Sequence, residues 1–132
     1  MADEINISLN VDVSSGNYRA SFRPGTIQPD MATITGSDLV QTITTSAFQA
    51  LGIGASVSAG GYFWFRNLST STSVTFDPSI KIAMGATNAA GTSTPFLNLR
   101  PGEFALGRCV TTTMCALSST QTANLQFGIM SA

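Results

Sequence analysis

Apolar and polar side chains alternate at the start of this chain, in the segment EINISLNVDV (residues 4–13). The apolar side chains occupy every second position: Ile5, Ile7, Leu9, Val11 and Val13. Because successive side chains of a strand point to opposite faces, this spacing predicts a strand with one buried face. The turn residues SSGN (14–17) follow, and alternation resumes in YRASF (18–22). We therefore expect these two runs to form a hairpin.

Two short segments, RPGT (23–26) and RPGE (100–103), have the residue order of a type II turn. Proline at the second position presets φ, and glycine at the third supplies the positive φ that this turn requires. We therefore expect four structural turn residues: Pro24, Gly25, Pro101 and Gly102. The second turn lies between the apolar runs FLNL and FALGR, and we expect it to fix the register of a hairpin of two core strands.

The segment between residues 31 and 52 allows two interpretations. MATIT (31–35) predicts a short strand that ends at GSD (36–38). In SDLVQTITTSAFQALG (37–52), apolar residues are spaced as on one face of a helix, yet QTITT is rich in β-branched residues, which favour strands. We favour two strands with a break near Ser46 and keep the helix as the alternative.

The most hydrophobic segment, YFWFRNL (62–68), has aromatic residues on both faces of a predicted strand. One face has Tyr62, Trp64, Arg66 and Leu68, and the other has Phe63, Phe65 and Asn67. A sheet with one wet face would not have aromatic side chains on both sides. One set belongs in the core, and the other must be covered by a loop, a second layer or another subunit. Tyr62, Trp64, Arg66 and Leu68 are therefore the candidate subunit interface.

About ten to twelve short strands are expected, separated by clusters of glycine, proline, serine or asparagine. The later strands are VTF (74–76), IKIAMG (80–85), TTMCALSS (112–119) and TANLQFGIM (122–130). This pattern predicts an all-β, antiparallel, jelly-roll-like β-sandwich that forms a single domain over residues 1–132. As an alternative for the first strand, residues 4–13 form an arm that exchanges between subunits.

The composition changes this picture mainly through its shortage of charge. Only 10% of the residues are charged, and the net charge is −1. The six basic residues are scattered singly, whereas nucleic-acid binding needs clustered arginine and lysine, so we expect no nucleic-acid partner. No apolar run approaches the roughly 20 residues that span a bilayer, so no membrane association is expected. The acidic, alternating start is unlike a signal peptide, and we expect synthesis in a cytoplasm without export through the secretory route.

Candidate chemistry is sparse along the chain. There is no histidine to activate a nucleophile, and the seven acidic residues are not grouped as a calcium loop or a general acid–base pair requires. We therefore expect no enzyme, no metal site and no cofactor. Cys109 and Cys115 are interpreted as small buried hydrophobic residues, with a disulfide as the alternative.

Three segments together resemble a family of small virion structural proteins of tailed bacteriophages: GYFWFRNLSTSTSVTF, FLNLRPGEFALGR and ANLQFGIM. The matching positions are Gly61, Tyr62, Arg66, Asn67, Leu68, Leu99, Pro101, Gly102, Glu103 and Arg108. The resemblance implies a capsid decoration or cement protein on the virion surface. Its expected partners are further copies of itself, as a homotrimer, and the major capsid protein.

A different function is expected if Tyr62 and Trp64, flanked by Arg66, form an exposed stacking platform for a sugar. The chain would then be a carbohydrate-binding, host-recognition domain on a phage tail or fibre. The two hypotheses differ in copy number, because a decoration protein is present in hundreds of copies and a tail protein in a few or a dozen.

Overall fold

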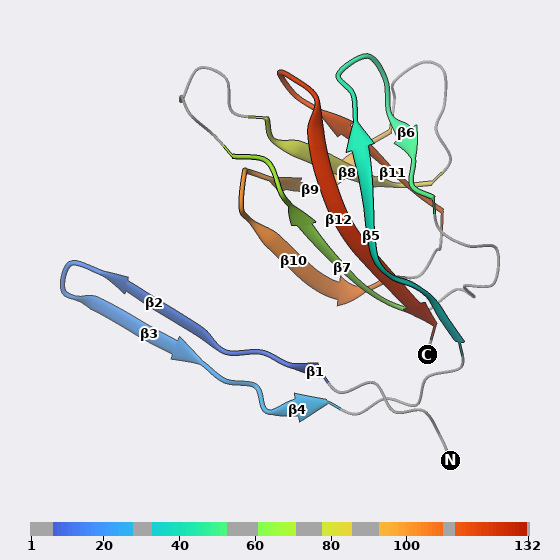
Figure 1. The fold of residues 1–132 in the computed structure, drawn as a ribbon. Helices are drawn as coiled ribbons and strands as arrows, with labels where there is room; N and C mark the ends of the chain where they lie inside the picture. The colour runs from blue at the N-terminus through green and yellow to red at the C-terminus, as the bar shows by residue number, and fades with distance from the viewer. Residues whose placement is uncertain are drawn as a thin grey trace. The chain divides into compact units, whose positions relative to one another are not determined.

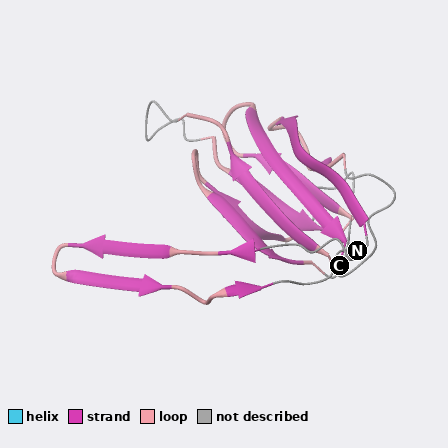
Figure 2. Ribbon diagram, turned by 60° about the horizontal axis from the view of Figure 1, so that its bottom comes forward, coloured by secondary structure: helices cyan, strands magenta, loops and turns pink. Residues whose placement is uncertain are grey.

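The computed structural model describes residues 7–27, 33–52, 61–70, 78–85, 93–109 and 113–131. These residues form strands and connections without any helix (Figure 2), and the strand pairs are antiparallel. The chain divides into two compact units, which comprise residues 1–32 with residue 132, and residues 33–131.

The N-terminal unit contains a two-stranded ribbon (Figure 1). Its strands are β1 (Ile7–Ser8), β2 (Val11–Ser15), β3 (Tyr18–Phe22) and β4 (Thr26–Ile27). β2 pairs with β3, and β1 pairs with β4 further along the ribbon, so the predicted hairpin is confirmed. The expected half-buried face is found at Ile7, Leu9 and Val11, which are partly buried between exposed polar neighbours, but it ends at Val13, and all side chains of β3 are exposed.

The described residues of the larger unit form eight strands in two four-stranded sheets. The strands are β5 (Thr33–Ile43), β6 (Gln49–Ala50), β7 (Tyr62–Asn67), β8 (Ile80–Met84), β9 (Pro95–Leu99), β10 (Phe104–Arg108), β11 (Met114–Ser118) and β12 (Ala123–Ser131). One sheet has the order β10-β7-β12-β5, and we call it the β7 sheet. The other has the order β6-β11-β8-β9, and we call it the β8 sheet.

Strand pairing in this unit is nested around the connection between β8 and β9. β8 pairs with β9, β7 with β10, β6 with β11, and β5 with β12. Nested pairing that alternates between two sheets is the arrangement of a jelly roll. The all-β, antiparallel sandwich predicted from the sequence is therefore confirmed.

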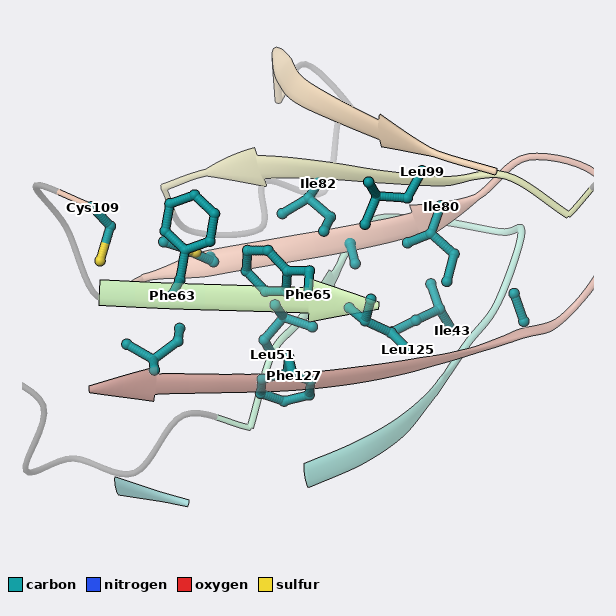
Figure 3. Packing of buried hydrophobic residues seen from close by; sticks show 14 residues of the cluster. Ile43, Leu51, Phe63, Phe65, Ile80, Ile82, Leu99, Cys109, Leu125 and Phe127 are labelled. Atoms are coloured by element: carbon teal, nitrogen blue, oxygen red, sulfur yellow. The ribbon is translucent and has the colours of Figure 1, made fainter. Parts of the chain in front are cut away.

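One hydrophobic core lies between the two sheets (Figure 3). The β7 sheet contributes Ile43, Phe63, Phe65, Leu125, Phe127 and Ile129, and the β8 sheet contributes Ile80, Ile82, Leu99, Met114 and Ala116. The ring centroids of Phe63 and Phe65 are 5.0 Å apart, and those of Phe65 and Phe127 are 6.4 Å apart. Burying a large apolar side chain is worth about 1.5–3 kcal/mol, so this core provides the main stabilisation of the unit.

The segment with two interpretations forms two strands, as favoured. β5 ends at Ile43, a bend covers residues 45–47, and β6 begins at Gln49. The predicted end of the first strand at GSD is wrong, because β5 continues through residues 36–38. There the register jumps: Phe127 of β12 pairs with Leu39, and Ile129 pairs with Thr35. A bulge therefore absorbs the turn-like residues. The predicted strand at residues 74–76 lies outside the described residues.

The RPGE turn has the expected local geometry but not the expected role. Gly102 has a φ of 80°, and the Glu103 N–H donates to the Arg100 carbonyl over 3.0 Å. The strands on either side do not pair with each other, because β9 belongs to the β8 sheet and β10 to the β7 sheet. The prediction of a hairpin is wrong, since the turn passes the chain from one sheet to the other.

Asn67 at the end of β7 fixes this crossing. Its fully buried side-chain amide donates to the carbonyls of Pro78 and Leu99 over 2.9 and 3.0 Å, and its Oδ1 accepts from the Ser69 N–H over 3.0 Å. Its backbone carbonyl accepts from the Gly102 N–H. The side chain of Asn67 thus ties β7 to β9 of the β8 sheet, and its backbone ties β7 to the turn.

Both cysteines are buried and free, which agrees with their interpretation as small hydrophobic residues. The Cys109 thiol donates to the carbonyl of Gly61 over 3.3 Å. Burial raises the pKa of this thiol above its ordinary value, because a thiolate would lose its hydration there.

Candidate interaction surface

β7 presents two different faces, as its sequence predicted. Phe63, Phe65 and Asn67 are buried on the inner face of the sheet. Their neighbours Tyr62 and Trp64 are half-buried on the outer face, where Arg66 is exposed. The strand is therefore a core strand on one side and a partly open aromatic surface on the other.

β10 extends this aromatic surface to the edge of the sheet. The register places Phe104 beside Arg66, Leu106 beside Trp64, and Arg108 beside Tyr62. Phe104 is 66% exposed, and Leu106 is also exposed. The expectation that the apolar residues of this segment belong to a core strand is therefore wrong for these two side chains.

The large side chains of β10 face outward because the ring of Phe63 occupies the space on the inner face of this strand. Ala105 packs against the core, and Gly107 also faces it. A Cβ at position 107 would lie 2.8 Å from Cζ of Phe63, so the ring occupies the space that a side chain there would need. The small residues of β10 consequently face inward, and the large ones face outward.

Glycine at position 128 lets the indole of Trp64 lie against the sheet. Gly128 of β12 pairs with Trp64 across the ladder. A Cβ at this position would lie 2.8 Å from Cε2 of Trp64, closer than side-chain atoms can approach. Because position 128 has no side chain, the indole fills this space and lies on the outer face, where it is partly buried.

The surface continues onto β5 and is charged at two points. Gln126 lies between Arg66 of β7 and Val40 of β5, and Val40 is 57% exposed. Cζ of Arg108 lies 5.6 Å from the ring centroid of Tyr62, within the range of a cation–π interaction. We call this surface the outer patch, and it comprises Val40, Tyr62, Trp64, Arg66, Phe104, Leu106 and Arg108.

Of the four residues of the candidate subunit interface, Tyr62, Trp64 and Arg66 lie together in the outer patch. Leu68 is exposed just beyond the end of β7, where its backbone N–H donates to the carbonyl of Asn124.

The turn residues predicted from the sequence lie in both units. Pro24 and Gly25 follow β3 in the N-terminal unit, where Gly25 has a φ of 91°. Pro101 and Gly102 lie in the connection between β9 and β10, in the larger unit.

Val40, Phe104 and Leu106 are not among the interface residues predicted from the sequence. The alternation in β10 was visible, and the presence of Gly107 between large residues was a usable signal. Which of the two sets faces the core depends on Phe63, which is distant in sequence.

The described residues contain no group of three or more cysteine, aspartate, glutamate or histidine side chains placed to hold a metal ion. Within the same part of the chain, no helix has the length and apolarity needed to cross a membrane. The sequence matches no protein-family model, and neither curated proteins nor solved structures provide a match.

Proposed function

We propose that this protein is a viral structural protein that decorates or cements a phage capsid through its outer patch. The observation that carries the proposal is the outer patch itself: large apolar and aromatic side chains lie on the outside of a sandwich whose core is already filled. Contiguous exposed apolar surface of this kind marks interaction sites in proteins. The resemblance of the sequence to small phage virion proteins supports the virus particle as the location of that interaction.

The size of the patch fits a repeated contact better than an isolated one. Covering its exposed apolar atoms would bury on the order of 350 Å², which is worth about 9 kcal/mol at 25 cal/mol per Å². Association itself costs roughly 4–15 kcal/mol in lost freedom of motion. One contact is therefore marginal, whereas several contacts made together in a homotrimer on a capsid lattice reinforce one another.

The fold supports this proposal only by analogy. Jelly rolls recur in viral capsid proteins and also in lectins, and a fold does not determine a function. In the proposed role the chain acts through burial and strand-edge pairing at the capsid surface, with the major capsid protein and further copies of itself as partners. Catalysis, a cofactor and nucleic acid have no part in it.

A carbohydrate-binding domain of a tail or fibre is the second candidate. The observation that favours it is the placement of Trp64, which lies over Gly128 with Tyr62 and Arg66 on the same face. Sugars stack on aromatic rings held in this way, and an arginine beside them supplies hydrogen-bond donors. Under this proposal the outer patch binds a glycan rather than a protein.

Copy number and location in purified phage particles test both proposals. The particles are isolated from the host of the virus that encodes the chain, the protein is quantified by mass spectrometry against the major capsid protein, and it is located by electron microscopy. Hundreds of copies on the head support decoration. A few or a dozen copies on the tail, with glycan binding lost in Trp64→Ala, support the second candidate. Absence from the particle contradicts both.

A further inference from the structure

We infer that the N-terminal hairpin is an assembly arm whose apolar face binds the outer patch of a second copy of this chain. The inference rests on the same patch as the proposed function and names its partner in the oligomer. The hairpin is amphipathic. Val11, Val13, Tyr18, Ala20 and Phe22 share one face by register, and we call this the arm face.

The opposite face of the hairpin is polar. It has Asp12, Ser14, Arg19 and Ser21, which alternate with the residues of the arm face. Asp12 and Arg23 form an exposed ion pair at 3.8 Å. These polar and charged side chains can be hydrated, so only the apolar arm face requires a partner to bury it.

The arm face is open within its own unit. Tyr18 is 63% exposed and Phe22 is 61% exposed, and Val13 is exposed beside them. A hairpin of two strands is marginally stable in water without a sheet or helix packed on it. The sequence nevertheless gives this hairpin the alternation of a half-buried strand, which indicates that its apolar side is covered in the working protein.

The dimensions of the two surfaces match. β2 and β3 have five residues each, so the arm face is about 17 Å long and about 10 Å wide. The paired part of β7 and β10 also has five residues, and with β12 and β5 the sheet is about 19 Å wide. The hairpin therefore fits along the outer patch, and its aromatic side chains meet those of Trp64 and Phe104.

The distribution of charge favours the arm face over a second outer patch as the occupant. The described residues 7–27 have one acidic and two basic side chains, and Asp12 and Arg19 lie on the polar face of the hairpin, so the arm face is uncharged. Both charged residues of the outer patch, Arg66 and Arg108, are basic. Contact between two outer patches would bring these like charges together, whereas the uncharged arm face does not repel them.

The area of this contact indicates a closed ring. One arm on one patch covers a few hundred Å² on each partner, less than the roughly 800 Å² per partner of a standard stable interface. Because arm and patch are different surfaces, the contact is head-to-tail, and such contacts reinforce each other when they close into a ring. Each copy then gives one arm and receives one, as in the homotrimer expected from the sequence.

The test uses the purified full-length chain and two double variants. Tyr18→Ser with Phe22→Ser removes both aromatic side chains of the arm face, and Phe104→Ser with Leu106→Ser removes two of the five apolar or aromatic side chains of the outer patch. Sedimentation velocity over a range of concentrations is expected to show a ring for the unchanged chain. Each double variant should self-associate at least about tenfold more weakly, because truncating a central aromatic anchor costs that much or more. Ser21→Ala, on the polar face of the hairpin, serves as the matched control and should leave the ring intact.

Mixing the two double variants separates arm-to-patch binding from the alternatives. The patch variant still has an intact arm, and the arm variant still has an intact patch, so only the mixture can form one contact. Chemical cross-linking is expected to trap a heterodimer in the mixture and no dimer in either variant alone. Circular dichroism must show that both variants keep the β-sandwich, and a third variant, Val40→Ser, tests the patch again if the Phe104 pair unfolds.

Three results would overturn the inference: a monomeric unchanged chain, a ring that survives loss of the arm face, or a mixture that forms no heterodimer. A monomer found in hundreds of copies on phage heads would overturn the arm and leave the proposed function standing. A ring that forms in solution, with no copies of the protein in the particles, would overturn the proposed function and leave the arm inference standing.

Discussion

Replacing Asn67 by leucine tests the crossing between the two sheets. The substitution keeps a side chain of similar size but removes the amide that donates to the carbonyls of Pro78 and Leu99 and accepts from the N–H of Ser69. Asn67 is fully buried, so the two carbonyls lose their partners in a place with little access to water. A buried polar group without a partner costs about 1–3 kcal/mol.

The expected loss in the free energy of unfolding is therefore about 3–5 kcal/mol, with the two carbonyls giving most of it. A domain of this size has roughly 5–15 kcal/mol in total, so the effect is large. Urea unfolding measures it, followed by circular dichroism and by the fluorescence of Trp64, the single tryptophan of the chain. Asn98→Leu, at an exposed position of β9, is the matched control and should change the stability by no more than about 0.5 kcal/mol.

Asn67→Asp adds a dependence on pH. A carboxylate facing two carbonyl oxygens without full hydration is disfavoured, so the pKa of this aspartate in the folded state should rise above its unfolded value of about 3.9. The stabilising contribution of the protonated form is then complete below that value and is lost as the pH rises through the folded pKa. A loss below about 1 kcal/mol in Asn67→Leu, or a stability of Asn67→Asp that rises from pH 4 to 7, would refute the role given to Asn67.

Three further predictions concern single positions. Gly128→Ala should push the indole of Trp64 off the sheet and shift its emission to longer wavelength, and an unchanged spectrum would contradict their packing. Gly102→Val should cost about 1–3 kcal/mol in thermal or urea unfolding because φ is 80° there, and Gly102→Asn should cost less; equal stability of all three chains would argue against the turn. In a Cys115→Ser chain, the raised pKa of Cys109 should move the pH profile of alkylation to higher pH than in the unfolded chain. Identical profiles for the folded and unfolded chains would contradict the burial of Cys109.

The sequence predicted the strands well because their signal is local. Alternation and turn residues are enough to place the hairpin of β2 and β3, and β-branched residues are enough to favour strands over a helix around Ser46. The two-sided aromatic strand β7 was also recognisable, since no single buried face accommodates both of its sets of rings. Three residues of the outer patch, Tyr62, Trp64 and Arg66, follow from that argument alone.

What could not be predicted depends on residues distant in sequence. Type II turn chemistry is the same in a hairpin and in a crossing between sheets, and the choice here is fixed by hydrogen bonds from Asn67. Alternation in β10 separates two sets of side chains but does not say which one faces the core, and Phe63 decides this by filling the space at Gly107. The exposure of Tyr18 and Phe22 is another case, because a pattern indicates that a face needs cover without showing what supplies it.

Hydroxyl-radical footprinting of the outer patch tests the central claim most directly. The oxidation rates of Trp64 and Phe104 are measured in the isolated chain, held dilute, and in purified phage particles, with the exposed Phe96 of β9 as an internal reference. If the outer patch is the surface through which the protein assembles, both patch residues should be oxidised several-fold more slowly in the particle while the reference changes little. Equal rates of oxidation for Trp64 and Phe104 in the two states would contradict it.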